Sequence, residues 1–274
     1  MQGLLKKYSS PCGRGWGGVI FISLVDTHAH LCALEFTRDL SAVLSRARAA
    51  GVAAVIAVGE TLVDAARNLE LSRQHPMIRP AAGLYPVVLE PDQAEDLHRF
   101  IRRNRMVLAA IGEVGLDYWM VKTERDRDLQ QEIFKGFIAL ACEMDLPLNV
   151  HSRSAGRPAI DLLLGSGASR VQLHAFDGRA STALPAVEAG YFLSIPPSVV
   201  RSRQKQKLVK QLPLTCLLVE TDSPVLGSEP AARNEPANLV QAVQAIAEIK
   251  SLPLQAVADA VAVNTTRLYG HVLP

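Results

Sequence analysis

The segment "VDTHAH" places an aspartate and two histidines at alternate positions: Asp26, His28 and His30. In a β-strand, side chains two residues apart point to the same side, so these three groups would share one face. Packing them together is costly unless something binds them. Imidazole and carboxylate groups are frequent metal ligands, and the segment therefore predicts part of a metal site.

Four more groups of the same chemical kind come at the ends of other apolar runs. They are Glu113 in "AIGEVGLDY", His151 in "LPLNVHSRS", His174 in "RVQLHAFDG" and Asp222 in "LLVETDSP". Taken singly, each has a simpler explanation as a hydrogen-bonded rim residue, a helix cap or a turn residue. Their joint placement, with His28 and His30, predicts one shared metal site.

The elements that must position these groups are short apolar runs alternating with amphipathic helical stretches. We expect strands within residues 19–26, 52–59, 78–86, 106–118, 146–154, 170–178, 191–197 and 215–224. Eight such strands separated by helices predict parallel pairing and an α/β fold of the (β/α)8 or TIM-barrel type. A doubly wound open sheet is the alternative. The lack of a G-x-G-x-x-G segment after the first strand weakens its dinucleotide-binding version.

In such a barrel, the carboxyl ends of all strands meet on one face, where active sites lie. The six candidate ligands would therefore converge. The remaining histidines, His75, His98 and His271, fall in helical or terminal segments with polar neighbours, and we expect them at the surface.

The bulk composition excludes several classes of protein. The chain has 274 residues and a formal net charge of +2, so it carries no global basic field of the kind that marks a pure nucleic-acid binder. No apolar run reaches the roughly 18 residues of a membrane span, and we expect no membrane association. The four cysteines are scattered without a C-x-x-C pair, which indicates reduced thiols and a cytoplasmic or nuclear location.

Residues 1–24 read as an N-terminal extension ahead of a single barrel domain at residues 25–274. The extension has no acidic residue and carries Lys6, Lys7 and Arg14. We expect it to be disordered, with a mitochondrial address as the alternative.

Five motifs in order, "VDTHAHL", "IGEVGLDY", "LPLNVHSRSAG", "LHAFDG" and "LVETDSP", resemble the TatD family of metal-dependent deoxyribonucleases, from about Val25 to about Leu268. That family belongs to the amidohydrolase-like barrel superfamily of metallo-dependent hydrolases. Three segments, "HSRSAGRP", "SIPPS" and "RSRQKQKLVKQLPLT", look most like one vertebrate branch of it.

The resemblance implies a monomeric hydrolase that uses two divalent metal ions to cleave phosphodiester bonds. His28 and His30 match the ligands of the first ion, and Glu113 matches the carboxylate that bridges both ions. His151 and His174 match the ligands of the second ion. Asp222 matches a metal ligand and catalytic base. The implied partner is DNA, as single strands or ends, degraded from 3′ to 5′. Magnesium, manganese and zinc all remain open.

The chain departs from the family pattern at "GLYP", where Tyr85 stands in place of a common histidine. Tyr85 could donate a hydrogen bond to a substrate phosphate but no positive charge. Ser152, Arg153 and Arg179 are the other candidates for phosphate binding. The basic run at residues 201–211 is either a backbone contact for nucleic acid or a solvated helix face.

Two other functions stay open at this point. The same metal site could act on an amide, an ester or a cyclic amide, because fold does not fix function. A non-catalytic, metal-bound binding module is the third possibility, and it predicts the loss of at least one ligand.

Overall fold

A computed structural model describes residues 23–273 of the chain. Within that range, one sheet of eight strands runs in the order β1-β2-β3-β4-β5-β6-β7-β8. Every neighbouring pair from β1·β2 to β7·β8 is parallel. The strands are β1 (Leu24–Ala29), β2 (Val52–Ala57), β3 (Ile78–Ala82), β4 (Ala110–Gly115), β5 (Leu148–His151), β6 (Val171–Leu173), β7 (Phe192–Ile195) and β8 (Leu217–Val219).

The end of β8 and the chain that follows it contact β1, which nearly closes the sheet into a barrel. The Asp222 amide donates to the His28 carbonyl, and the His30 amide donates to the Ser223 carbonyl, both at 2.8 Å. The Thr27 hydroxyl donates to the Val219 carbonyl at 2.9 Å. The predicted (β/α)8 barrel is therefore confirmed, and the open doubly wound sheet is excluded.

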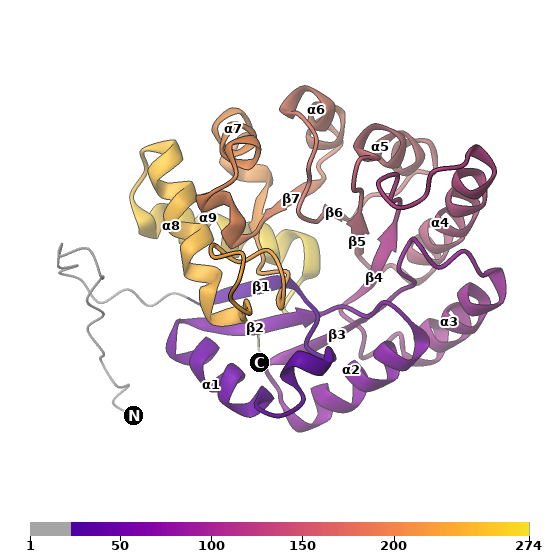
Figure 1. The fold of residues 1–274 in the computed structure, drawn as a ribbon, viewed down its shortest axis with the longest axis horizontal. Helices are drawn as coiled ribbons and strands as arrows, with labels where there is room; N and C mark the ends of the chain where they lie inside the picture. The colour runs from indigo at the N-terminus through magenta and orange to yellow at the C-terminus, as the bar shows by residue number, and fades with distance from the viewer. Residues whose placement is uncertain (1–22, 274) are drawn as a thin grey trace.

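Helices surround the barrel (Figure 1). Within the described residues they are α1 (Leu40–Ala49), α2 (Leu62–Gln74), α3 (Pro91–Asn104), α4 (Glu124–Met144), α5 (Gly156–Gly165), α6 (Ala180–Glu188), α7 (Arg203–Gln211), α8 (Leu239–Lys250) and α9 (Leu254–Tyr269). Short 3-10 helices are η1 (Leu34–Phe36), η2 (Pro197–Val200), η3 (Leu214–Cys216) and η4 (Pro236–Asn238).

Local sequence explains where several helices begin. The Thr61 and Thr123 side chains accept hydrogen bonds from backbone amides in the first turns of α2 and α4. Pro91 occupies the first turn of α3, where its missing N–H costs nothing. Ser202 caps α7 in the same way as the threonines, so most of the basic run at residues 201–211 lies in α7.

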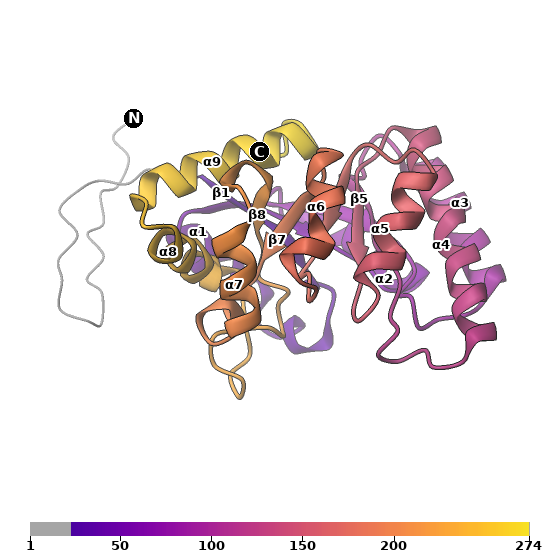
Figure 2. The same cartoon turned by 90° about the horizontal axis from the view of Figure 1, so that it is seen from above.

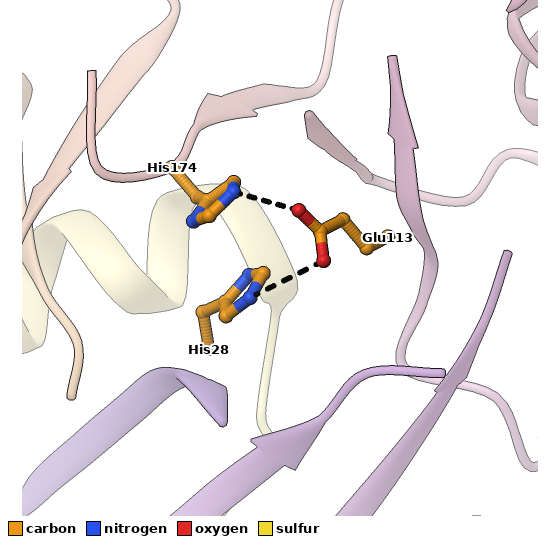
Figure 3. A group of neighbouring side chains, drawn as sticks. All are labelled: His28, Glu113 and His174. Carbon is orange, nitrogen blue, oxygen red and sulfur yellow. Dashed lines mark ion pairs between the residues drawn. The ribbon is translucent and has the colours of Figure 1, made fainter. Parts of the chain in front are cut away.

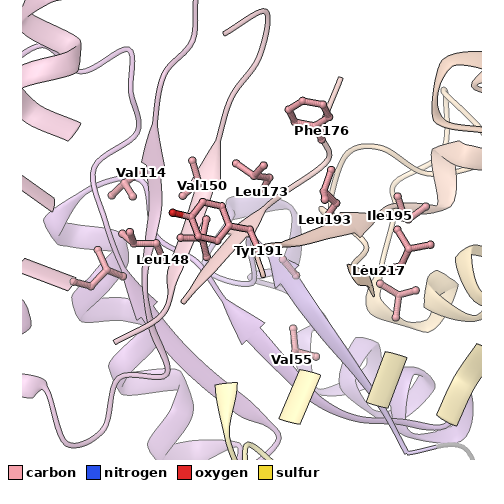
Figure 4. Packing of buried hydrophobic residues seen from close by; sticks show 14 of the residues in the cluster. Val55, Val114, Leu148, Val150, Leu173, Phe176, Tyr191, Leu193, Ile195 and Leu217 are labelled. Atoms are coloured by element: carbon pink, nitrogen blue, oxygen red, sulfur yellow. The ribbon is translucent and has the colours of Figure 1, made fainter. Parts of the chain in front are cut away.

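Successive side chains along the strands alternate between the helix layer outside the barrel and the interior of the barrel. Outward-facing side chains such as Val150, Leu173 and Leu193 pack under the helices (Figure 4). Inward-facing side chains form a separate apolar layer inside the barrel that includes Phe192 and Leu218, together with residues of other strands. This two-sided burial is typical of parallel strands in α/β proteins, and it explains their nearly continuous apolar sequences.

The end of α9 closes one end of the barrel (Figure 2). Leu268, Tyr269 and Val272 belong to the inner apolar layer. The Tyr269 hydroxyl donates to Gln172 Oε1 at 2.6 Å and accepts from Asn149 Nδ2 at 3.2 Å. The C-terminal helix thus contacts the same inward-facing residues that lead toward the carboxyl ends of the strands.

The surface prediction for His98 is wrong. His98 is buried on α3, and its ring packs edge-on against Phe137 of α4, with 4.6 Å between centroids. Of the polar neighbours that suggested exposure, Glu95 and Arg99 are themselves exposed, and Glu95 Oε1 lies 3.5 Å from His98 Nδ1. Burial lowers the pKa of His98, which is consistent with a neutral ring in the helix interface.

No helix among residues 23–273 is long and apolar enough to span a bilayer. The N-terminal extension expected at residues 1–24 falls almost entirely outside the described residues, and Leu24 already belongs to β1.

Candidate metal centre

All six predicted metal ligands meet at the carboxyl ends of the strands. His28 lies in β1, Glu113 in β4 and His151 at the last position of β5. His30, His174 and Asp222 follow β1, β6 and β8. The six residues come from positions up to 194 apart in the sequence, and the barrel topology brings them together as predicted.

One group of donor atoms comes from the first and last strands. His28 Nε2 and His30 Nε2 lie 3.2 Å apart. Asp222 Oδ1 lies 3.5 Å from His28 Nε2 and 3.4 Å from His30 Nε2. Asp222 has a φ of 54°, in the left-handed region that non-glycine residues rarely adopt. Two imidazole nitrogens and a carboxylate oxygen therefore point at one another.

A second group lies on the other side of Glu113. Glu113 Oε1 lies 2.6 Å from His151 Nδ1 and 2.9 Å from His174 Nε2. The same two ring nitrogens lie 3.2 Å from each other. This group also consists of two imidazole nitrogens and one carboxylate oxygen.

Glu113 joins the two groups with different oxygens (Figure 3). Its Oε1 faces His151 and His174, whereas its Oε2 lies 3.5 Å from His30 Nε2 and 3.9 Å from His28 Nε2. The side chain is 2% exposed. One buried carboxylate thus contacts donor atoms on both sides.

The charges of the cluster are strongly coupled. Burial disfavours the charged form of Glu113, but His174 and His151 outweigh burial and hold the pKa of Glu113 well below its ordinary value. Burial also opposes protonation of His28, yet its contact with Asp222 and the charge of Glu113 raise the pKa of His28 to about 10. Two anionic carboxylates in a buried site therefore attract positive charge.

The pKa values of His151 and His174 shift in opposite directions. Contacts with Glu113 and Asp117 overcome burial and raise the pKa of His151 to about 9. Burial, followed by the charge of His28, lowers the pKa of His174 to about 4. The carboxylates thus favour protons on His28 and His151, whereas burial opposes a proton on His174.

Two neighbours of the predicted ligands fix the rings, and sequence reasoning did not single them out. Asn149 Oδ1 lies 2.8 Å from His28 Nδ1, and Asp117 Oδ2 lies 3.0 Å from His151 Nε2. Acceptors on the far ring nitrogens leave His28 Nε2 and His151 Nδ1 free to face the cluster. The signal was present, because Asn149 is two residues from His151 in a strand and would share its face.

Glu220 is a third residue that sequence reasoning missed, two positions before Asp222. Its Oε2 lies 3.9 Å from His174 Nδ1, a buried atom without a hydrogen-bond partner among the described residues. Burial raises the pKa of Glu220 to about 7. Its Oε1 accepts from the Ala175 amide at 2.7 Å, so Glu220 fixes the chain just after His174.

Asp26 takes a structural place beside the cluster. Its Oδ1 accepts from the Thr221 amide at 2.8 Å and from the His28 amide at 3.3 Å. Asp26 thereby ties β1 to the chain that follows β8, which positions His28 and Asp222 relative to each other. Glu60, after β2, was not predicted, and its Oε1 lies 3.6 Å from His30 Nδ1.

The donor atoms fit divalent metal ions. Three sets each place one ligand atom per residue within 4.8 Å of one another: His28, Glu113 and His174; His28, His30 and Asp222; and His30, Glu60 and Glu113. Imidazole nitrogens that face each other at 3.2 Å, and the outward acceptors on the rings of His28 and His151, are typical of ligating histidines.

A cleft of about 450 Å³ opens over the cluster. Its walls include three of the four residues predicted to bind substrate, namely Tyr85, Ser152 and Arg153. The buried Ser152 Oγ has no hydrogen-bond partner among the described residues. Arg179 is exposed at the start of α6 and is not among the residues that line the cleft, so the structure does not bring it to the site.

Lys205 of α7 also lines the cleft, and it belongs to the basic run for which the sequence left a nucleic-acid contact and a solvated helix face as alternatives. It is 8% exposed, and its Nζ donates to the Ala175 carbonyl at 2.7 Å. Within residues 23–273 it forms no ion pair with a carboxylate at 4.0 Å or less. Burial lowers its pKa, whereas the charges of Glu220 and Asp177 favour its protonated form.

A parallel eight-stranded barrel with buried histidines and carboxylates at the carboxyl ends of its strands defines the class of metal-dependent barrel hydrolases. The family model for TatD-related DNases matches residues 25–270, and the chain belongs to that family. The resemblance stated from the motifs is therefore confirmed over most of the chain.

Individual relatives agree with this placement. Human deoxyribonuclease TATDN3 is 44% identical over 260 residues, which cover 90% of this chain and 95% of the human protein. The metal-dependent hydrolase YabD of Bacillus subtilis is 34% identical over 254 residues, covering 90% and 98%. The crystal structure of a TatD homologue from Escherichia coli aligns with a TM-score of 0.84 at 28% identity, covering 91% and 99%. The vertebrate branch that three segments resembled is thus the TatD domain-containing protein 3 branch.

Proposed function

We propose that the chain is a deoxyribonuclease that hydrolyses phosphodiester bonds with two divalent metal ions, acting from the 3′ end of single-stranded DNA. The observation that carries this proposal is the placement of Glu113, whose two oxygens face two separate histidine pairs. A carboxylate in that position would reduce the repulsion between two neighbouring cations. The names of the relatives support the choice of DNA.

In this proposal, His28, His30 and Asp222 would hold one ion, His151 and His174 would hold the other, and Glu113 would offer one oxygen to each side. When bound, the two ions would lower the pKa of a water molecule and neutralise charge on the phosphate oxygens. Zinc, manganese and magnesium are all compatible with imidazole and carboxylate ligands, with water completing the shell of magnesium.

Asp222 is the proposed base. The hydrogen bonds of Asp222 to His28 and His30 overcome the effect of burial and hold the pKa of this carboxyl far below its ordinary value. The carboxylate is therefore ionised at neutral pH and can accept a proton from the attacking water at Oδ2, which leaves Oδ1 toward the histidines. The proton then passes to the leaving oxygen or to solvent.

Four side chains of the cleft are proposed to hold the substrate phosphate. Ser152 Oγ and the Tyr85 hydroxyl are hydrogen-bond donors, and Arg153 and Lys205 add positive charge. Burial raises the pKa of Tyr85, so its hydroxyl keeps its proton and can donate it in a hydrogen bond. Lys205 would thus supply, on the cleft wall, the positive charge that Tyr85 lacks in place of the common histidine.

The experiment uses a 5′-labelled single-stranded oligonucleotide and the purified full chain, with EDTA, magnesium or manganese. The expected result is a metal-dependent ladder that shortens from the 3′ end and is lost in Asp222→Asn. Glu229→Gln, in the exposed loop after β8, is the matched control and should cleave like the wild type. An intact oligonucleotide with metal demonstrably bound contradicts the proposal and directs attention to amide or ester substrates.

A further inference from the structure

An exposed tryptophan stands beside the cleft. Trp119 lies in the loop after β4, and 55% of its surface is exposed. A tryptophan ring in that position presents a large flat apolar face to solvent. Its neighbour Met120 is equally exposed at 56%, which makes Met120 a matched reference position.

Two cations contact the Trp119 ring. Arg153 Cζ lies 5.2 Å from the ring centroid, and Lys122 Nζ lies 5.1 Å from it. Neither cationic group forms an ion pair or a hydrogen bond with another side chain of residues 23–273. Arg153 also lines the cleft over the metal centre. The ring and two available cations therefore form one surface that continues into the cleft.

The loop that carries Trp119 is fixed to the metal centre. Asp117 Oδ1 accepts from the Met120 amide at 2.8 Å, while Asp117 Oδ2 lies 3.0 Å from His151 Nε2. The Tyr118 amide donates to the Arg153 carbonyl at 3.0 Å. The position of the aromatic ring is thus set by the same carboxylate that orients a proposed metal ligand.

We propose that Trp119 is a stacking platform for a nucleobase of single-stranded DNA, with Arg153 and Lys122 on the neighbouring phosphates. Aromatic side chains interleaved with cations are the usual means of binding single strands, because every base has a face that can stack. A platform fixed relative to the metal centre would set which phosphodiester bond reaches it. This inference rests on the proposed nuclease function and adds a binding site for the base.

The test measures binding apart from hydrolysis. Trp16 and Trp119 are the two tryptophans of the chain, so Trp16→Phe leaves Trp119 as the reporter. Short oligodeoxythymidylate, added in EDTA at low ionic strength, should quench the fluorescence of that variant. An abasic oligonucleotide of the same length, which keeps the phosphates and lacks the bases, should quench far less.

Affinity and kinetics then separate stacking from a structural role. Trp119→Ala should weaken binding and lower kcat/KM for oligodeoxythymidylate by about 5- to 100-fold, the usual effect of losing one stacked base. It should leave binding of the abasic oligonucleotide unchanged, and Met120→Ala should alter neither. The inference is overturned if oligodeoxythymidylate does not quench the fluorescence of Trp16→Phe. It is also overturned if Trp119→Ala weakens binding of both oligonucleotides equally. Quenching without any metal-dependent cleavage would instead refute only the proposed nuclease function.

Discussion

At the scale of single residues, three of the proposed ligands are positioned by neighbours that are not ligands themselves. The His28 ring is hydrogen-bonded to Asn149, and the His151 ring is hydrogen-bonded to Asp117. Glu220 accepts a hydrogen bond from the backbone just after His174. These partners hold ring orientation and tautomer, so removing one should disturb metal binding while the ligand itself remains. The metal centre is therefore larger than its six donor side chains.

Asn149→Ala should lower metal affinity by about 10- to 100-fold, because His28 loses the acceptor that orients its ring. Isothermal titration with manganese or zinc measures the change. Asn264→Ala is the control, since Asn264 is equally buried but bonds the Leu214 and Leu217 carbonyls at the start of β8. Equal affinities in both variants would contradict a role of Asn149 at the site.

Metal affinity should rise steeply with pH. Without metal, the pKa values of His28 and His151 are raised to about 10 and about 9, so both rings carry protons at neutral pH. Raised histidine pKa values stabilise the metal-free fold at low pH, and this contribution is lost as pH rises toward those values. Metal must displace these protons. The gain in Tm on adding manganese should therefore grow from about pH 6 to about pH 9. A gain that is constant over this range would contradict the protonated metal-free state.

At the scale of elements, the barrel strands and the gathering of the six polar side chains at one end of the barrel were readable from the sequence. Apolar runs marked the strands, and the polar residues at the ends of five of them marked the site, because parallel strands share one carboxyl edge. The role of α7 was not readable. The run "RQKQKLVKQ" has the composition of a solvated helix, and only the contact of α7 with the chain after β6 buries Lys205. Arg179 shows the opposite error, since its place near "LHAFDG" in sequence does not bring it into the cleft.

Lys205→Met should raise KM for the oligonucleotide about 10- to 100-fold, since a charge-assisted hydrogen bond to phosphate is lost. Lys207→Met is the control on the same helix, because Lys207 is exposed and outside the cleft wall. Inhibition by inorganic phosphate should weaken in Lys205→Met alone, an effect that a purely structural lysine would not produce. Equal KM values in the two variants would remove Lys205 from the proposed substrate site.

At the scale of the whole molecule, a chain of buried hydrogen bonds runs through the barrel from α9 to the metal centre. It passes from the Tyr269 hydroxyl to Asn149 and on to His28, and a second branch passes through Gln172 to Glu220. Sequence could not reveal this connection, because Tyr269 is 120 residues from Asn149 and meets it only when α9 covers the end of the barrel.

Tyr269→Phe should therefore lower both the free energy of unfolding, by about 1–3 kcal/mol, and the metal affinity. Tyr191→Phe is the matched control, since its buried hydroxyl donates to the Ala168 carbonyl outside this chain of hydrogen bonds. Tyr191→Phe should lower stability similarly and leave metal affinity unchanged. Chemical denaturation and metal titration measure the two quantities. Unchanged metal affinity in Tyr269→Phe would show that α9 stabilises the barrel without acting on the site.

The most direct test of the central claim is anomalous diffraction from crystals of the full chain grown with manganese. We predict two peaks on either side of Glu113, one beside His28, His30 and Asp222 and the other beside His151 and His174. A single peak, or two peaks that do not share Glu113, would contradict the two-metal site on which the proposed hydrolysis rests.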